Sequence, residues 1–292
     1  MNRAIGLLVL AACGGPQSRK STPNAMLSIA ADDRMVTVPS GQFIMGSTLE
    51  ERAAAYDDYQ QSAGQDAARE NKWFDHEPDR KITELDAFRI DLMPVTQAQY
   101  AEMVNAGKAQ VPTIDEATWK AQGFQQDFAT EVTRNLWKDG RPPHGREDHP
   151  VVLVNYTEAE RYCAWRGEQR GETRRLPTAI EYEKAARGDA GFAYPWGNVY
   201  DGAKLNSAVA GPKDTTPAGQ FNEGASPFGV LELAGNVFQW TSTPENPGKG
   251  DRMVVKGSAY EDFAGIGRGA AFHGRSKTAR HVIVGFRCAA DA

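Results

Sequence analysis

Two stretches near the C-terminus decide the fold of this chain: Val254-Val255-Lys256-Gly257-Ser258-Ala259-Tyr260 and Gly285-Phe286-Arg287-Cys288-Ala289. The apolar residues at 253–255, followed by a glycine, predict a short strand that ends in a turn. Residues 164–287 contain no cysteine. No thiol is therefore available between the two stretches for redox chemistry or for binding a soft metal ion.

Three other segments predict short helices that begin at a threonine and end at a glycine. Each has Glu or Gln three residues after the threonine, which allows the two side chains to cap the first turn reciprocally. Glycine at the far end can adopt the left-handed conformation. Apolar residues recur at helical spacing, so each helix should bury one face. The segments are residues 96–107, 157–167 and 178–188.

Regular structure is sparse elsewhere in the chain. Short strands are predicted at residues 35–38, 43–45 and 87–90, in addition to 253–255. Residues 189–250 are dense in Gly, Pro, Asn, Asp and Thr. So much irregular chain in a compact domain needs aromatic anchors, disulfides or bound cations to hold it.

Two segments have the character of insertions within one domain. Residues 49–72 have helix-forming composition and many charges, and residues 108–148 combine several aromatic residues with a Gly- and Pro-rich loop. The chain has no internal repeat and is long enough to bury one sizeable core. We therefore predict one domain over residues 35–292 that contains both segments.

The N-terminus has the pattern of an export signal. One basic residue precedes a short apolar run at residues 4–10, which is too short to span a membrane. Leu10-Ala11-Ala12-Cys13 fits the lipobox of bacterial lipoproteins, which implies removal of residues 1–12 and acylation of Cys13. An ordinary secretory signal is the alternative. Residues 13–34 predict a flexible tether.

The predicted location follows from this signal and from the charge. The residue after Cys13 is glycine rather than the aspartate of inner-membrane retention, which favours the outer membrane of a bacterial cell envelope. The net charge of -5 is mild, and no basic block indicates nucleic acid. We expect the membrane to be contacted through the lipid on Cys13.

The cysteine count predicts one disulfide. If Cys13 carries lipid, Cys163 and Cys288 remain, and such a pair tends to close in an oxidising compartment. We predict a bond between them, and two buried free thiols are the alternative. A bond that closes a loop of this length contributes roughly 4–5 kcal/mol in the chain-entropy model.

Taken in order, the motifs resemble the formylglycine-generating enzyme (sulfatase-modifying factor) family over about residues 35–290. The resemblance is carried by the two stretches quoted above and by Val38-Pro39-Ser40-Gly41, Arg175-Leu176-Pro177-Thr178, Tyr194-Pro195-Trp196-Gly197-Asn198 and Gly235-Asn236-Val237-Phe238-Gln239-Trp240. It implies an α+β, C-type-lectin-like fold with little regular structure, a small twisted antiparallel sheet and short flanking helices. It also implies the bond between Cys163 and Cys288.

The resemblance also shows what this chain lacks. Oxidase members of the family bind Cu(I) through two cysteine thiolates, which suit that soft ion. Asp262 and Gly267 stand at those two places, and Ala259 stands where the family has a nearby serine. We therefore expect no copper, and we assign no catalytic residue.

The same segment supplies the candidate binding residues. In the family it forms a groove, and mixed acidic and basic side chains there suit a polar or peptide ligand. A solvated edge is the alternative. The groove candidates are Glu261, Asp262, Arg268, His273 and Arg275.

Calcium is the cofactor that the resemblance implies. Asn, Asp and carbonyl oxygens suit this hard cation. Family calcium positions fall near Asn206, Asp214 and Asn236, and Gln239 stands where the family has a glutamate. A neutral amide weakens a cation site, so the second calcium is in doubt. Plain turn chemistry is the alternative for these residues.

The sequence as a whole predicts an envelope lipoprotein whose domain is a non-catalytic binding or scaffolding module for an unknown protein or polar ligand. Two enzymatic hypotheses remain open. One is a family oxidoreductase with different chemistry, of which iron-dependent chemistry is one form. The other is a formylglycine-generating oxidase that acts on sulfatases.

Overall fold

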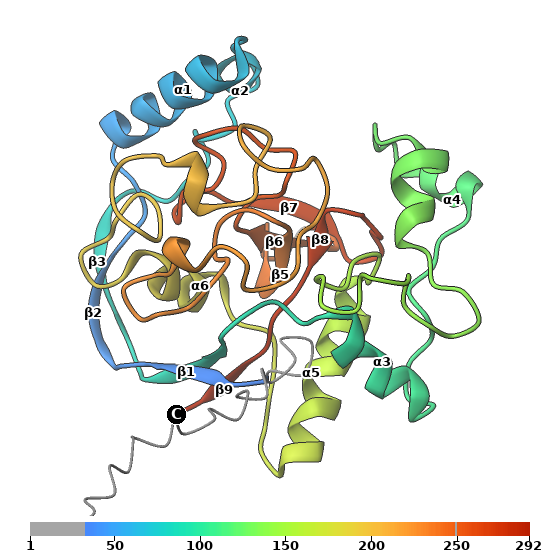
Figure 1. Cartoon of the computed structure of the whole chain (residues 1–292). Coiled ribbons are helices and arrows are strands. Elements are labelled where there is room, and N and C mark those ends of the chain that lie inside the picture. The colour runs from blue at the N-terminus through green and yellow to red at the C-terminus, as the bar shows by residue number, and fades with distance from the viewer. Residues whose placement is uncertain (1–32, 249) are drawn as a thin grey trace, which may run out of the picture.

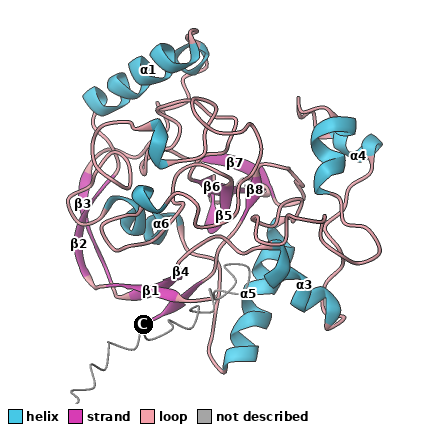
Figure 2. Ribbon diagram, viewed as in Figure 1, coloured by secondary structure: helices cyan, strands magenta, loops and turns pink. Residues whose placement is uncertain are grey.

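The computed structural model describes residues 33–248 and 250–292. The predicted signal peptide, Cys13 and nearly all of the predicted tether lie outside the described residues. Loops dominate the chain, and short helices and strands are spread among them, as the α+β lectin-like fold requires (Figures 1 and 2). No helix in the described part combines the length and apolar character needed to span a bilayer.

Two of the three capped helices form as predicted. α3 (Gln97–Asn105) follows Thr96, and α6 (Ala179–Arg187) follows Thr178. In both, the threonine hydroxyl accepts the backbone N–H three residues on, and the Gln or Glu at that position accepts the N–H of the threonine. Local sequence therefore fixes where these helices begin.

The third helix differs from its prediction at both ends. α5 (Tyr156–Arg170) has Asn155 rather than Thr157 as its N-cap, because Asn155 also has a glutamate three residues on. The helix continues through Gly167 and ends at Gly171, whose φ is 70°. Gly167 does not end the helix but allows the following turn to pack closely, since a Cβ there would lie 2.5 Å from a backbone oxygen of that turn.

The strands form three small sheets in the described residues, where one was predicted. All four predicted strands are present, and each of the three sheets is small, as predicted for the single sheet. The first sheet has the order β1 (Met35–Val38), β4 (Phe88–Asp91), β9 (Ala289–Asp291). The second pairs β2 (Gly41–Met45) with β3 (Lys81–Leu85).

The third sheet lies at the centre of the molecule (Figure 1). Its order is β7 (His273–Ser276), β6 (Arg252–Lys256), β5 (Phe238–Pro244), β8 (Val284–Gly285). β5 and β8 run parallel, and the other pairs are antiparallel. β7 is an edge strand, which leaves its outer side available to other groups.

The two segments with the character of insertions lie at the periphery of Figure 1. Residues 49–72 form α1 (Leu49–Ala63) and α2 (Ala67–Glu70). Residues 108–148 contain α4 (Glu116–Ala121), a π-helical turn at Phe128–Val132 and a 3-10 turn at Thr133–Asn135.

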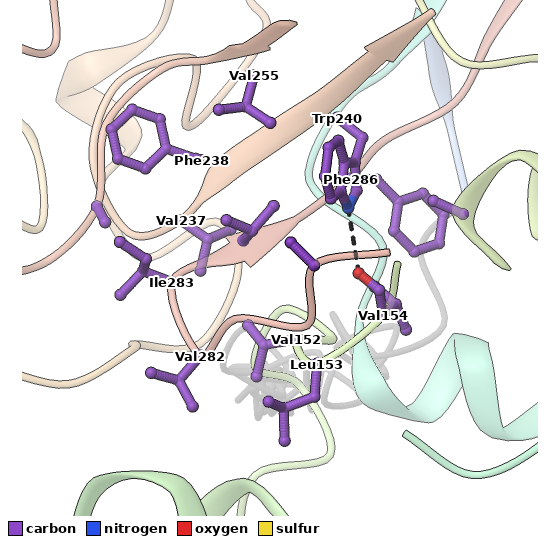
Figure 3. Packing of buried hydrophobic residues seen from close by; sticks show 14 of the residues in the cluster. Val152, Leu153, Val154, Val237, Phe238, Trp240, Val255, Val282, Ile283 and Phe286 are labelled. Carbon is purple, nitrogen blue, oxygen red and sulfur yellow. Dashed lines mark hydrogen bonds between the residues drawn. The ribbon is translucent and has the colours of Figure 1, made fainter. Parts of the chain in front are cut away.

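The main core forms around Trp240 of β5 (Figure 3). Its indole is fully buried, and Nε1 donates to the carbonyl oxygen of Val154 at 3.1 Å. This bond satisfies the polar edge of the ring inside an apolar cluster. Each such large buried side chain contributes roughly 1.5–3 kcal/mol through removal of apolar surface from water.

The disulfide prediction is confirmed. Cys163 of α5 is bonded to Cys288, and both residues are fully buried. The bond joins positions 125 residues apart and fastens α5 to the strand that precedes the C-terminus. No thiol remains at either residue for metal binding.

A candidate ligand groove beside β7

Asp262 closes a turn beside the third sheet. Its Oδ2 accepts the N–H of Ala259 at 2.7 Å, and its own N–H donates to the carbonyl oxygen of Ala259 at 3.0 Å. Burial raises the pKa of Asp262 to about 7, and the neighbouring Glu261 carboxylate acts in the same direction. Asp262 therefore presents a carboxyl group that is partly protonated near neutral pH.

Gly267 occupies a place with no room for a longer side chain. A Cβ built there would lie 2.9 Å from the hydroxyl oxygen of Ser258 and 3.4 Å from the Cβ of Ala234. The same hydroxyl accepts the N–H of Gly235 at 2.8 Å, and Ser258 is buried. A thiol at this position would have to displace a buried hydrogen bond.

Arg275 and His273 of β7 line a hollow of about 510 Å³. Trp73 and His76, which follow α2, line the same hollow. A second hollow of about 220 Å³ lies next to the first, because Arg275 and Arg252 line both. We call these two neighbouring hollows, which share Arg252 and Arg275 in their lining, the β7 groove.

Arg275 has no ion-pair partner in the described chain. Its Nη1 donates to the carbonyl oxygen of Gly274 at 3.0 Å, and its Nε is buried without a hydrogen-bond partner. Burial lowers the pKa of Arg275, whereas the nearby Asp262 carboxylate raises it. The guanidinium therefore keeps N–H groups that no protein acceptor uses.

His273 is a neutral side chain in the wall of the groove. Burial lowers its pKa to about 3, with the charge of Arg275 as a further cause. Its ring contacts Phe238 at 5.1 Å and Trp73 at 6.5 Å between ring centroids, both nearly perpendicular. At neutral pH this imidazole can accept and donate a hydrogen bond without carrying charge.

α1 supports one wall of the groove. Tyr59 packs edge-on against Trp73 and Phe263, at 5.4 and 5.8 Å between ring centroids. Ser62 accepts the N–H of Ala264 at 3.1 Å. The 49–72 segment is thus fastened to the loop that follows Asp262.

The 108–148 segment supports the other wall. Phe124 lines the second hollow and packs on His281 with 3.9 Å between ring centroids. Trp119 contacts the same histidine at 5.3 Å. Gln126 donates to the Glu261 carboxylate at 2.6 Å, and burial raises the pKa of Glu261.

Of the five predicted groove residues, His273 and Arg275 line the β7 groove. Glu261 and Asp262 line neither hollow, although their charges act on Arg275, and Arg268 lies elsewhere. The two Nη atoms of Arg268 donate to the carboxylate oxygens of Glu77, each at 2.9 Å, and both side chains are buried. Its guanidinium also lies over the ring of Phe74. Arg268 therefore holds the chain after α2 and lines a different hollow.

At the first predicted calcium position the carboxylate is already paired with an arginine, whereas the Asn206 side-chain oxygen is buried without a hydrogen-bond partner. The Asp214 carboxylate receives Arg146 on both oxygens at 2.8 Å, and Asn206 uses its amide N–H on the Asp214 carbonyl oxygen. Although burial raises it, the pKa of Asp214 is held below its usual value by Arg146. A guanidinium from the 108–148 segment thus stands where the positive charge of a metal would be needed.

At the second predicted calcium position, the side-chain oxygens also accept hydrogen bonds from the protein. The Gln239 oxygen accepts Nε of Arg287 at 2.5 Å, and the Asn236 oxygen accepts the N–H of Thr216 at 3.0 Å. Arg287 is fully buried and also donates to the carbonyl oxygen of Glu232 at 2.9 Å. In the described residues, no three His, Cys, Asp or Glu side chains gather to hold a metal ion.

Several residues of the groove carry no signal in the sequence. Trp73 and His76 lie in a charged stretch without periodicity, and Arg252 is the first residue of a strand, a common place for a surface arginine. Phe124 stands out only as one aromatic residue among several. Their proximity arises from tertiary packing, which sequence spacing does not report.

A small-sheet, lectin-like α+β domain with a polar groove beside its edge strand is the class that this fold and site define. Residues 23–292 match the family model described as "Sulfatase-modifying factor enzyme 1-like domain", and the chain belongs to this FGE-sulfatase family.

Similar proteins include one described as inactive and one described as an oxygenase. The chain is 30% identical to "Inactive C-alpha-formylglycine-generating enzyme 2" of Mus musculus, across 93% of this chain and 90% of that protein. It is 31% identical to "Hercynine oxygenase" of Mycolicibacterium smegmatis, across 78% of this chain but only 49% of that protein. Among solved structures, "PvdO from Pseudomonas aeruginosa" superposes with a TM-score of 0.66 at 19% identity, covering 88% of this chain and 94% of that one, which bears on the fold alone.

Proposed function

We propose that this chain is a non-catalytic binding module of the bacterial cell envelope, whose polar ligand occupies the β7 groove. One observation carries the proposal. The two cysteines of the described chain are bonded to each other, and the two positions that bear thiols in the oxidases are Asp262 and Gly267. These two positions therefore offer no soft donor pair for monovalent copper.

The packing around these positions favours the same function. Asp262 closes a turn, and Gly267 has no space for a side chain next to Ser258. The relative from Mus musculus is itself described as inactive. Fold alone does not determine activity, so the assignment depends on the groove residues.

A second candidate function is an oxidoreductase with iron-dependent chemistry. It is favoured by the similarity to hercynine oxygenase, of which this chain spans about half. A third is formylglycine generation on sulfatases by an altered mechanism. Both require a metal-binding group, and the described residues supply no cluster of three His, Cys, Asp or Glu side chains.

Oxygen consumption separates these functions. The purified protein is supplied in turn with Cu(I) and Fe(II), together with a peptide containing Cys-x-Pro-x-Arg. We expect no uptake above a protein-free blank with either metal. Uptake with copper, accompanied by an aldehyde in the peptide, would overturn the binding-module proposal in favour of the third function. Uptake with iron would favour the second.

We also propose that a lipid on Cys13 holds the domain at the outer membrane. The lipobox pattern at residues 10–13 is the basis. The Cys13→Ser variant should lose labelling by radioactive palmitate and move from the membrane fraction to the soluble periplasmic fraction. Unchanged labelling would show that another residue carries the lipid, and unchanged fractionation would show that the lipid is not the anchor.

A further inference from the structure

The β7 groove contains one arginine whose charge the protein does not balance. Arg252 pairs with Glu245 through Nε and donates to the carbonyl oxygen of Gly274 at 2.7 Å, so its charge is matched. Arg275 lines both hollows, and no carboxylate of the described chain lies within the 4.0 Å of an ion pair. Its Nε is buried without a partner.

A buried N–H group without a hydrogen-bond partner costs free energy, and Nε of the partly buried Arg275 is such a group. An anionic ligand in the hollows that Arg275 lines would balance the charge of the guanidinium. The two acids nearest to Arg275 compensate it only in part. Burial raises the pKa of Glu261 and raises that of Asp262 to about 7, so the Asp262 carboxyl is only partly charged near neutral pH. Glu245, which also lines the first hollow, is paired with Arg252. Glu261 is also engaged by Gln126. The groove is therefore prepared for a carboxylate from outside.

The hollow that Arg275 lines also offers an aromatic surface. Trp73 is 36% exposed, which is unusual for so large an apolar ring. Contacts with Tyr59 and His273 hold the ring in place. The remaining lining is polar and suited to hydroxyl groups, since Asn71 and Asn246 supply amides beside the neutral imidazole.

We propose that the β7 groove binds a carboxylate-bearing oligosaccharide, with its carboxylate on Arg275 and one sugar ring against Trp73. The proposal rests on the binding-module function given above and specifies its ligand. Planar carboxylates match the geometry of a guanidinium. Sugar rings have flat C–H faces that pack on indole, and their hydroxyls bond to amides. Two neighbouring hollows on either side of Arg252 and Arg275 suit a short chain rather than a single ring.

Isothermal titration of the full-length protein in detergent tests the class of ligand. The probe is tetragalacturonate, a chain of four acidic sugars. Maltotetraose has the same length without charge, and tetraglutamate has the charge without sugar rings. We expect tetragalacturonate to bind at least tenfold more tightly than either control. Equal binding of maltotetraose, tighter binding of tetraglutamate, or no binding of tetragalacturonate at millimolar concentration would each overturn the proposal.

Two substitutions test the contacts. Arg275→Gln removes the charge, and Trp73→Ala removes the ring; each should weaken binding of tetragalacturonate roughly tenfold or more, as for loss of a hydrogen bond to a charged group or of a large contact surface. The matched controls are Arg141→Gln and Trp196→Ala, which lie outside the groove and should bind as the wild type does.

Circular dichroism establishes that each variant is folded. Trp73 lies in an exposed turn, so Trp73→Ala alone decides the matter if Arg275→Gln does not fold. Unchanged binding by Trp73→Ala would refute the proposed contact. Failure of all the sugars, with no oxygen uptake in the assay described above, would reject this ligand class and leave the binding-module function in place.

Discussion

Replacing Arg146 by methionine should weaken the attachment of the 108–148 segment to the loop that contains Asp214. Arg146 donates to both carboxylate oxygens of Asp214 at 2.8 Å, to the Thr215 hydroxyl at 2.6 Å and to the Asn135 side-chain oxygen at 3.1 Å. The Met side chain keeps most of the apolar stem and removes every one of these donors. The Asp214 carboxylate then lacks its principal counter-charge.

The expected loss follows from the burial of the pair. Breaking a fully buried ion pair costs about 3–5 kcal/mol, whereas an exposed pair contributes about 0–1 kcal/mol. The side chains of Arg146 and Asp214 are 14% and 22% exposed, so solvent screens them only in part. We expect the free energy of unfolding, measured by urea denaturation near pH 7, to fall by about 2–3 kcal/mol.

A double-mutant cycle makes this prediction specific. Asp214→Asn should cost about 2 kcal/mol less in the Arg146→Met background than in the wild type, because the charge pair is already broken. Arg141→Met is the control, since the Arg141 side chain is exposed and makes no ion pair in the described chain. A loss below about 1 kcal/mol for Arg146→Met, or a coupling near zero, would refute the reasoning. Stabilisation of the wild type by several degrees in Ca²⁺ relative to EGTA would also contradict it.

Three further measurements follow from the same structure. Reduction of the Cys163–Cys288 bond, which spans 125 positions, should lower the free energy of unfolding by roughly 4–5 kcal/mol in urea with dithiothreitol, and a change below 1 kcal/mol would contradict the loop-closure argument. The Asp262→Asn variant should gain stability relative to the wild type between pH 4.5 and pH 7.5. The wild-type carboxyl, whose pKa is raised to about 7 in the folded protein, favours folding while it is protonated and loses this contribution as the pH rises through that value. Parallel urea midpoints for the two proteins would show that the group is not buried as described. Gly267→Ala should lower stability by about 1–3 kcal/mol, because its Cβ meets the hydroxyl of Ser258 at 2.9 Å, and an unchanged thermal midpoint would mean that the site relaxes freely.

The parts of the fold that sequence predicts are those fixed by local chemistry or by counting. Thr96 and Thr178 cap their helices because the Gln or Glu that completes the box lies in the same turn. The disulfide was predictable because only Cys163 and Cys288 remain once Cys13 is assigned to lipid. α5 shows the limit of such reasoning, since Asn155 and Thr157 both satisfy the pattern and packing selects the first.

The parts that sequence does not predict depend on partners far away in the chain. Arg268 lies within the expected groove segment, but it turns toward Glu77, almost two hundred positions earlier. Asp214 has the character of a calcium ligand until Arg146 is placed beside it. For both residues, the sequence shows that the side chain is charged, but only the tertiary structure shows which group neutralises that charge.

The position of Arg146 near the end of the 108–148 segment divides that segment into two parts with different freedom to change. Its last residues attach the segment to the Asp214 loop through Arg146, which also bonds to Asn135. The earlier residues do not take part in that anchorage: Phe124 lines the groove, and Gln126 bonds to Glu261. Substitutions in the earlier residues can therefore change the recognition surface, while the residues around Arg146 keep the segment attached to the domain.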